Sequence, residues 1–224
     1  MIQDPTNQYI TAIAAHCDLS GKEILEVGCG RGRITRDLAQ HAGKVLATDP
    51  DIEALEAARA TVTAGNVEFR HAPTGMPDLP EESFDLVIYT LSLHHVPPTL
   101  MSDSLRKSAR LLRKGGVMVV VEPGDGGSFS EAKERFGAGS GNERPAREAA
   151  IRAMHALDGW EVGRTVRFRT QFHFRDEEDF FASMLRGDRP ASFLNRVRQF
   201  LDQYRTPAGI ILDAERRLNI ISRR

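Results

Sequence analysis

The sequence has few cysteines, no long apolar run and almost no net charge. Its two cysteines, Cys17 and Cys29, cannot build a disulfide framework or a metal-ligand set, which predicts a reducing, cytoplasmic location. No stretch approaches the roughly 20 apolar residues that span a bilayer, and the polar start shows no signal peptide, so no membrane partner is expected. With 30 basic and 31 acidic residues, the net charge of −1 provides no global attraction for nucleic acid. Composition leaves the oligomeric state unknown.

What is present is a regular alternation of short apolar runs and amphipathic segments. The apolar runs, which predict strands, lie at residues 23–28, 44–49, 66–72, 84–90 and 116–123. The segments with helical spacing lie at residues 9–19, 32–43, 51–65 and 99–114. This alternation predicts an α/β fold, a doubly wound (Rossmann-like) and mostly parallel sheet with helices on both faces.

The chain after residue 123 loses this regularity. Residues 124–145 are rich in glycine, serine and charge, which predicts a mobile loop around a short helix. A helix is expected at 146–159, an alternating strand at 166–174, helices at 176–186 and 192–204, and a last strand at 218–222. We therefore predict one domain over 1–224. Its expected parts are a cofactor-binding core (1–123), substrate-cap segments with helical character (124–160 and 176–205) and C-terminal strands (166–174 and 214–222).

A glycine-rich turn, "EILEVGCGRGRIT" at 23–35, follows the first apolar run. Turns of this kind bring backbone close to a cofactor at the carboxyl ends of the strands. A nucleotide-triphosphate loop is excluded, because no Gly-Lys-Ser/Thr follows the glycines. The dinucleotide fingerprint is incomplete, because Arg33 occupies the place of its third glycine after Gly28 and Gly30. The glycines alone leave the ligand open.

Two acids narrow the choice of ligand. Glu26, at the end of the first strand, would repel a pyrophosphate but attract an ammonium group. Asp49, at the end of the second strand, can accept hydrogen bonds from ribose hydroxyls. Together they suggest S-adenosylmethionine, which carries both groups and no phosphate. The alternative is that each acid caps the following helix.

These residues resemble the class I S-adenosylmethionine-dependent methyltransferases, in particular the broad small-molecule methyltransferase group. The resemblance lies in "EVGCGRGRIT", "ATDPD", "LPEESFDLVIYTLSLHHV" and "LRKGGVMVVVEP", and covers about the first 125 residues. It implies a seven-stranded sheet with a reversed final strand and S-adenosyl-L-methionine as cofactor. The cofactor-binding residues that it implies are Tyr9, Glu26, Gly28, Gly30, Arg31, Thr35, Asp49, Pro50, Ala72, Pro73, Thr90 and Leu91.

Within that set, Glu26 and the glycines are expected at the methionine end, Asp49 at the ribose and Pro50 at the adenine. Tyr9 either closes over the cofactor or packs in the core. The chain departs from the family after the third strand, where Ala72 and Pro73 replace the usual Gly-Asp. Adenine recognition is then expected from backbone groups or from Thr74.

The candidate catalytic residues are His94 and His95, just after the fourth strand. An imidazole has the pKa range of a general base near neutrality, although histidines here can also serve only to position the cofactor. The loop offers no carboxylate cluster, so no metal is expected. It also lacks the tetrapeptide that the family's DNA-base methylating members carry.

The sequence thus predicts an enzyme that transfers a methyl group to an oxygen or nitrogen of a small-molecule metabolite. Two alternatives stay open: a protein that binds S-adenosylmethionine without methyl transfer, and a nicotinamide-dependent dehydrogenase. The sequence does not identify the methyl acceptor, because one fold of this kind hosts many chemistries.

Overall fold

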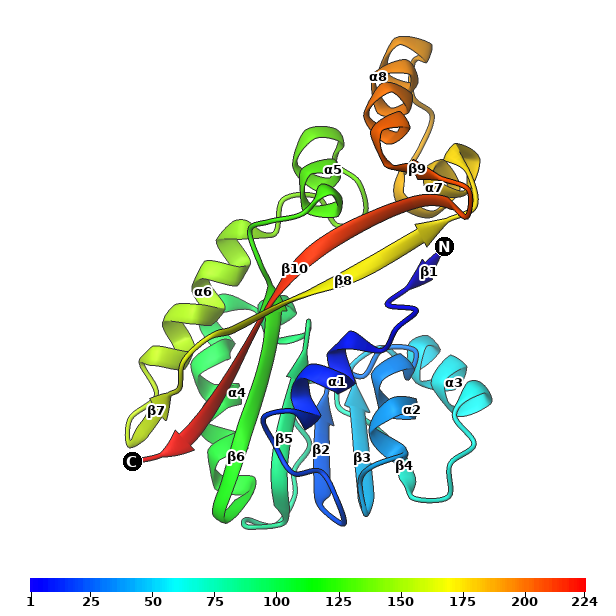
Figure 1. The fold of residues 1–224 in the computed structure, drawn as a ribbon. Helices are drawn as coiled ribbons and strands as arrows, with labels where there is room; N and C mark the ends of the chain where they lie inside the picture. Colours follow the sequence, from blue (N-terminus) through cyan, green and yellow to red (C-terminus); the bar gives the residue numbers. More distant parts are fainter. The chain divides into compact units, whose positions relative to one another are not determined.

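A computed structural model describes all 224 residues, which divide into two compact units. The larger unit comprises 9–122, 145–166 and 217–224. The smaller unit comprises 1–8, 123–144 and 167–216. Figure 1 shows the helices and strands of both units.

The larger unit is built on five parallel strands, in the spatial order β4-β3-β2-β5-β6. Their bounds are β2 (Glu23–Val27), β3 (Lys44–Asp49), β4 (Val67–His71), β5 (Phe84–Thr90) and β6 (Leu112–Pro123). The chain order reverses between β2 and β5, which is the switch point where ligands of open α/β sheets bind. The register brings the strand ends level there, since Val27 pairs with Thr48 on one side and with Tyr89 on the other.

Helices cover both faces of this sheet (Figure 1). They are α1 (Gln8–Ala14), α2 (Arg33–Ala39), α3 (Ile52–Thr61), α4 (Pro98–Leu111) and α6 (Arg144–His155). On one face, α4 contributes Met101 and Leu105, and α6 contributes Ala150 and Met154, to a core with the inward side chains of β2, β5 and β6. Burial of these apolar stripes is the main force that holds the helices on the sheet.

The last strand of the larger unit runs against the others. β10 (Gly209–Arg223) has its C-terminal part in this unit, follows β6 in the strand order and points the opposite way in Figure 1. There it pairs antiparallel with the short β7 (Trp160–Val162), and Ile221 packs in the same core as Trp160. The expected doubly wound α/β fold and its reversed final strand are confirmed.

The smaller unit has its own apolar core. Its elements are β1 (Ile2–Gln3), α5 (Ser128–Phe136), β8 (Val166–Phe174), α7 (Glu177–Met184), α8 (Ala191–Leu201), the 3-10 turn η2 (Asp202–Tyr204), β9 (Arg205–Thr206) and the first part of β10. Aromatic side chains dominate the core: Phe129 stacks on Phe172, and Phe174 meets Phe180 edge-on. The exposed side of its strands carries ion pairs, such as Arg167 with Glu215.

The structure differs from the sequence prediction in the extent of some elements. The helix expected at 99–114 ends at Leu111, and β6 begins at Leu112. Arg113 therefore lies in β6, where it forms ion pairs with Glu23 and Asp85. Ten strands are present in all, where seven were expected, and three of them, β1, β8 and β9, belong to the smaller unit. Residues 145–160, which we expected in the cap, group with the larger unit because α6 buries its apolar face there. No helix combines the length and apolar character needed to cross a bilayer.

Candidate functional site

A pocket of about 440 Å³ opens at the carboxyl ends of β2, β3 and β5 in the larger unit. Seven of the predicted site residues line it: Gly28, Gly30, Asp49, Pro50, Pro73, Leu91 and His95. Seven further residues complete the lining: Val27, Thr74, Gly75, Ser92, Val96, Pro97 and Leu100. The pocket therefore joins four chain segments at the switch point of the sheet.

The glycine turn lies against the segment that follows β5. A Cβ atom on Gly28 would stand 2.5 Å from Cβ of Ser92, and the backbone of Gly28 is left-handed (φ 77°). Ser92 cannot yield easily, because its hydroxyl donates to the carbonyl of Val27 at 2.5 Å. The absent side chain of Gly28 thus allows two walls of the pocket to touch.

Asp49 ties the turn to the next strand. Its Oδ2 accepts from the backbone N–H of Gly30 at 2.7 Å, and its Oδ1 accepts from that of Asp51 at 2.9 Å. Each carboxylate oxygen has a second acceptor site, so the side chain can still receive hydroxyl donors from a ligand. The cap of α3 is instead Asp51, which accepts from Glu53 and Ala54. The helix-cap alternative for Asp49 is therefore wrong.

Glu26 is almost fully buried behind the turn, with 1 % of its surface exposed. Its Oε2 accepts from the hydroxyl of Thr35 at 2.6 Å. Burial raises the pKa of the Glu26 carboxyl to about 7, against the opposing effects of the Thr35 hydrogen bond and the charge of Arg33. A cation bound beside this buried carboxylate would stabilise its ionised form, because it would replace the hydration that burial removes.

The end of β5 carries two signs of an incomplete site. The hydroxyl of Thr90 is buried and has no hydrogen-bond partner. Leu91 has a left-handed backbone (φ 56°), which is rare for a residue with a side chain, while its N–H is fixed to the carbonyl of Val121 at 2.8 Å. Unpaired polar atoms and backbone strain both concentrate at functional sites.

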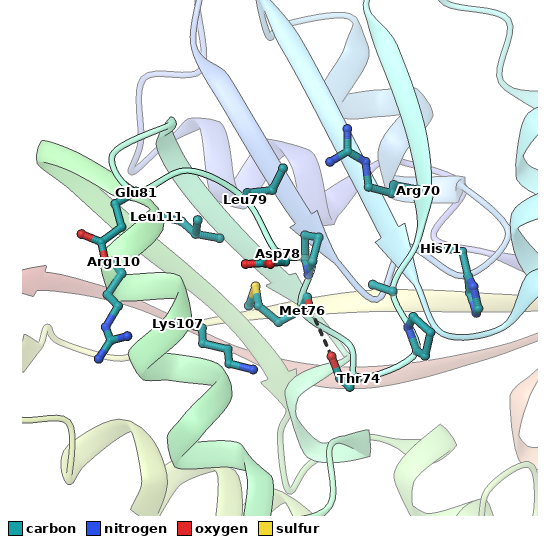
Figure 2. A pocket seen from close by; sticks show the side chains of 13 residues that line it. Arg70, His71, Thr74, Met76, Asp78, Leu79, Glu81, Lys107, Arg110 and Leu111 are labelled. Carbon is teal, nitrogen blue, oxygen red and sulfur yellow. Dashed lines mark hydrogen bonds between the residues drawn. The ribbon is translucent and has the colours of Figure 1, made fainter.

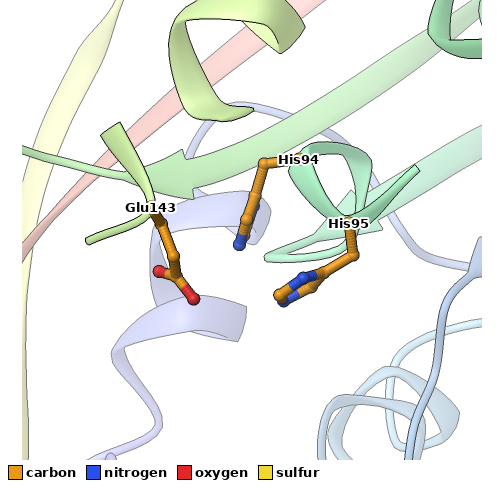
Figure 3. A group of neighbouring side chains, drawn as sticks. All are labelled: His94, His95 and Glu143. Atoms are coloured by element: carbon orange, nitrogen blue, oxygen red, sulfur yellow. The ribbon is translucent and has the colours of Figure 1, made fainter. Parts of the chain in front are cut away.

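The two histidines follow in the 3-10 turn η1 (Leu93–His95), and Figure 3 shows their rings. His95 is exposed and lines the pocket, whereas His94 is buried. The Nδ1 atom of His94 lies 2.6 Å from Oε2 of Glu122 in β6. Glu143, drawn in the same figure, belongs to the smaller unit, where Lys133 donates to it at 2.5 Å. The sequence predicts the same role for both histidines, whereas the structure places only His95 at the pocket.

A family model described as a methyltransferase domain matches residues 24–116. Its span includes the glycine turn, Asp49, Thr90 and both histidines. Residues 24–116 thus form a methyltransferase domain. This match agrees with the sequence prediction of S-adenosylmethionine as the methyl donor.

Curated relatives match over the same part of the chain. A ubiquinone biosynthesis O-methyltransferase from Xanthomonas oryzae is 35% identical over 108 residues, which are 46% of this chain and 44% of that protein. An uncharacterized methyltransferase from Anoxybacillus flavithermus is 29% identical over 54% of this chain and 56% of its own. The chain thus spans about half the length of the curated relatives it matches.

Solved structures share the fold over most of the chain. A putative methyltransferase from Bacillus halodurans superimposes with a TM-score of 0.62 and 17% identity, covering 96% of this chain and 98% of that one. An S-adenosylmethionine-dependent methyltransferase from Mesorhizobium loti gives 0.53 and 18%, covering 95% and 98%. At such identities the likeness concerns the fold alone.

The polar groups at this pocket fit S-adenosylmethionine. Buried Glu26 offers a negative charge for an ammonium, Asp49 offers acceptors for ribose hydroxyls, and Thr90 has a hydroxyl in need of a partner. Gly28 and Gly30 leave room for a ligand to approach the backbone. Nothing in this set favours a phosphate group.

Not every predicted cofactor residue lines the pocket. Tyr9 is fully buried, with the guanidinium of Arg33 stacked 4.7 Å from its ring centre, as the core-packing alternative expects. Arg31 is exposed and lies outside the lining. Glu26, Thr35 and Thr90 stand behind the surface of the pocket.

Ala72 lines a neighbouring pocket instead, which Figure 2 shows from close by. The two pockets share Pro73 and Thr74. Thr74 lies at this shared wall, where its hydroxyl donates to the carbonyl of Met76 at 3.1 Å. Its side chain is therefore already engaged. Of the two routes to adenine recognition, this arrangement favours backbone groups of the loop.

Sequence reasoning missed Ser92 and Glu122. Ser92 sat inside the recognised "SLHHV" stretch, and its small side chain beside a glycine turn was the available signal. Glu122 ends an apolar run and is buried. Because a buried carboxylate needs a polar partner, its position in the sequence was the available signal. Neither contact is visible without the pairing of β5 with β2 and β6.

The pKa of Glu26 predicts a pH-dependent stability of the cofactor-free protein. A folded-state pKa raised from 4.5 to about 7 favours folding while the group is protonated, and this contribution is lost as the pH rises towards and through 7. Between about pH 5 and pH 8 we expect a loss of about 2.5 kcal/mol that Glu26→Gln does not share. Urea unfolding of both proteins at the two pH values measures it. Parallel losses would show that Glu26 does not titrate in this range.

Proposed function

We propose that this methyltransferase transfers a methyl group to an oxygen or nitrogen of a small-molecule metabolite. The observation that carries the proposal is the single pocket in which the glycine turn, Asp49, Leu91 and His95 meet. The name of the Xanthomonas relative, an O-methyltransferase of ubiquinone biosynthesis, supports oxygen as the first acceptor to test.

The cofactor supplies a methyl group already activated by its sulfonium, so the protein's part is binding, orientation and proton removal. In our proposal Glu26, held by Thr35, binds the ammonium, and Asp49 binds the ribose. Pro50, Pro73 and the neighbouring backbone would contact the adenine, while Gly28, Gly30 and Leu91 would form the floor beneath the cofactor, with Thr90 behind them. Holding the acceptor in line with the methyl group supplies most of the rate.

His95 is the better candidate for a general base. It lines the pocket and is exposed, whereas the Nδ1 of His94 is held by Glu122. For a hydroxyl acceptor, a nitrogen of the His95 ring would take the proton as the new carbon–oxygen bond forms and the methyl carbon–sulfur bond breaks, with the electron pair left on sulfur. An acceptor that arrives ionised would need no base.

We propose that residues beyond 123, in the segments 124–160 and 176–205, select the methyl acceptor. The match to the family model ends at 116, and the curated relatives share only about half their length with this chain. The regions outside the shared core are where members of one fold family differ in specificity.

A panel assay tests the proposal. Phenols, hydroxy acids and amines are incubated with S-adenosylmethionine, and release of S-adenosylhomocysteine is followed together with the methylated product. We expect one acceptor class to be methylated, and His95→Ala to lower its turnover about 100-fold with cofactor affinity retained.

Three outcomes would revise this proposal. Cofactor binding without turnover across the panel would favour a binding protein that transfers no methyl group. Tighter binding of NADH than of S-adenosylmethionine would favour a dehydrogenase. Equal turnover in His95→Ala would remove the base but leave the reaction class intact.

A further inference from the structure

Glu122 and His94 form a buried contact directly beside the pocket. Their side chains are each only 2% exposed, and Nδ1 of His94 lies 2.6 Å from Oε2 of Glu122. The other oxygen, Oε1, is 3.4 Å from the backbone N–H of His94. The side-chain atoms do not meet in ideal hydrogen-bond geometry, so the contact is a close approach of the two groups, which becomes an ion pair when His94 is protonated.

Such a pair is costly to bury. A carboxylate withdrawn from water loses its hydration, and one close partner rarely repays that loss in stability. An apolar residue at the end of β6 would continue the run Val119–Val121 and pack without this cost. The contact of Glu122 with His94 therefore explains the acid better than a contribution to stability does.

What Glu122 holds is the turn that carries His95. It contacts both the ring and the backbone N–H of His94, the residue before His95 in η1. The N–H of His95 donates to the carbonyl of Ser92 at 3.1 Å, and Ser92 is itself anchored to Val27. The two histidine rings lie 4.1 Å apart between their centres, tilted by 42° (Figure 3). A shift of His94 would therefore move the ring of His95.

We propose that Glu122 is a positioning residue for methyl transfer, which acts through His94 to fix the ring of His95 at the pocket. The proposal rests on the proposed function for its kinetic consequence, but not for its structural one. It assigns no contact between Glu122 and the ligand. Misplacement of a reacting group by about 1 Å can cost on the order of 100-fold in rate.

The test compares Glu122→Gln, Glu122→Ala, His94→Ala and the double variant Glu122→Ala with His94→Ala. Glutamine keeps the shape and an acceptor for the backbone N–H, but loses the charge. Asp37→Asn, at another buried acid of the same unit that pairs with Arg36 on α2, is the matched control. The readouts are S-adenosylmethionine affinity by calorimetry, the His95 ring resonance by NMR, and turnover on the acceptor class that the panel identifies.

We expect the His95 resonance to change in Glu122→Ala as it does in His94→Ala, and to change less in Glu122→Gln. S-adenosylmethionine affinity should stay within about twofold, while turnover falls roughly 100-fold in the alanine variant and about 10-fold in the glutamine variant. The double variant should be no slower than His94→Ala, because both changes break one linkage.

An unchanged His95 resonance in Glu122→Ala would overturn the proposal, and so would additive losses in the double variant. Equal loss of affinity and turnover in Glu122→Gln would assign the acid a structural role and also overturn it. The NMR readout needs no acceptor, so failure of the proposed function leaves this test decisive.

Discussion

Replacing Glu26 by glutamine is expected to weaken S-adenosylmethionine binding on the order of 50-fold at about pH 8, while the fold stays intact. Glutamine retains the size of the side chain and an acceptor for the hydroxyl of Thr35. It loses the charge that would meet the ammonium, and a hydrogen bond to a charged group contributes about 1.5 to 3 kcal/mol. Isothermal titration calorimetry measures the change, and thermal unfolding shows that the variant is folded.

The same comparison at about pH 6 sharpens the assignment. Because the pKa of Glu26 is raised to about 7, the wild-type carboxyl must lose a proton before it can bind a cation at that pH. We expect the wild-type affinity to fall about tenfold per pH unit below 7, and the affinity of Glu26→Gln to be flat. The advantage of the wild type should therefore shrink at pH 6.

Asp37→Asn again provides a control, since Asp37 is also buried in α2 and pairs with exposed Arg36. It should leave the cofactor affinity unchanged. Asp49→Ala should also weaken binding, but it is a less clean test, because Asp49 holds the N–H groups of Gly30 and Asp51 as well. Equal affinities of wild type and Glu26→Gln at about pH 8 would remove Glu26 from the ammonium site.

The second large effect is expected at Gly28. Alanine there would place its Cβ 2.5 Å from that of Ser92, in a left-handed backbone conformation that disfavours any side chain. The conformation costs about 1 kcal/mol and the overlap about 2 kcal/mol more, so unfolding should become easier by about 3 kcal/mol. For a chain of this size the melting temperature would fall by roughly 6 to 12 °C. Cofactor affinity should drop at least about tenfold, because Ser92 lines the pocket.

Gly30 is the matched control for this prediction. It is also left-handed (φ 54°), but a Cβ there would meet nothing within 4 Å. Gly30→Ala should therefore cost only about 1 kcal/mol. Adding Ser92→Gly to Gly28→Ala removes the overlapping atom and should recover the larger part of the loss. If Gly28→Ala were as stable as Gly30→Ala, the close approach of the turn to Ser92 would be wrong.

Much of the lining of the candidate site could be predicted because it depends on local patterns. Gly28, Gly30, Asp49 and Pro50 each follow an apolar run, and the carboxyl ends of parallel strands meet at one edge. The same reasoning is weaker for the third strand, after which the sequence predicts Ala72 among the cofactor-binding residues. The loop turns Ala72 towards the neighbouring pocket and leaves Pro73 at the shared wall.

The histidines show the limit of sequence reasoning most clearly. Adjacent residues in a 3-10 turn point in different directions, and which one meets the pocket depends on the neighbours of the turn. Here Glu122 binds His94 inside the protein, and His95 is left at the surface of the pocket. That choice arises from the pairing of β5 with β6, which joins residues far apart in the chain.

The class of fold, the family and the methyl donor could be predicted from the sequence, because they follow from periodicity and from the resemblance carried by short motifs within single strand–turn–helix units. Three features became visible in the folded protein alone: Gly28 must lack a side chain against Ser92, Thr90 keeps an unpaired hydroxyl, and Glu122 holds one histidine. These features are contacts between strands, and contacts follow from register and burial rather than from local pattern.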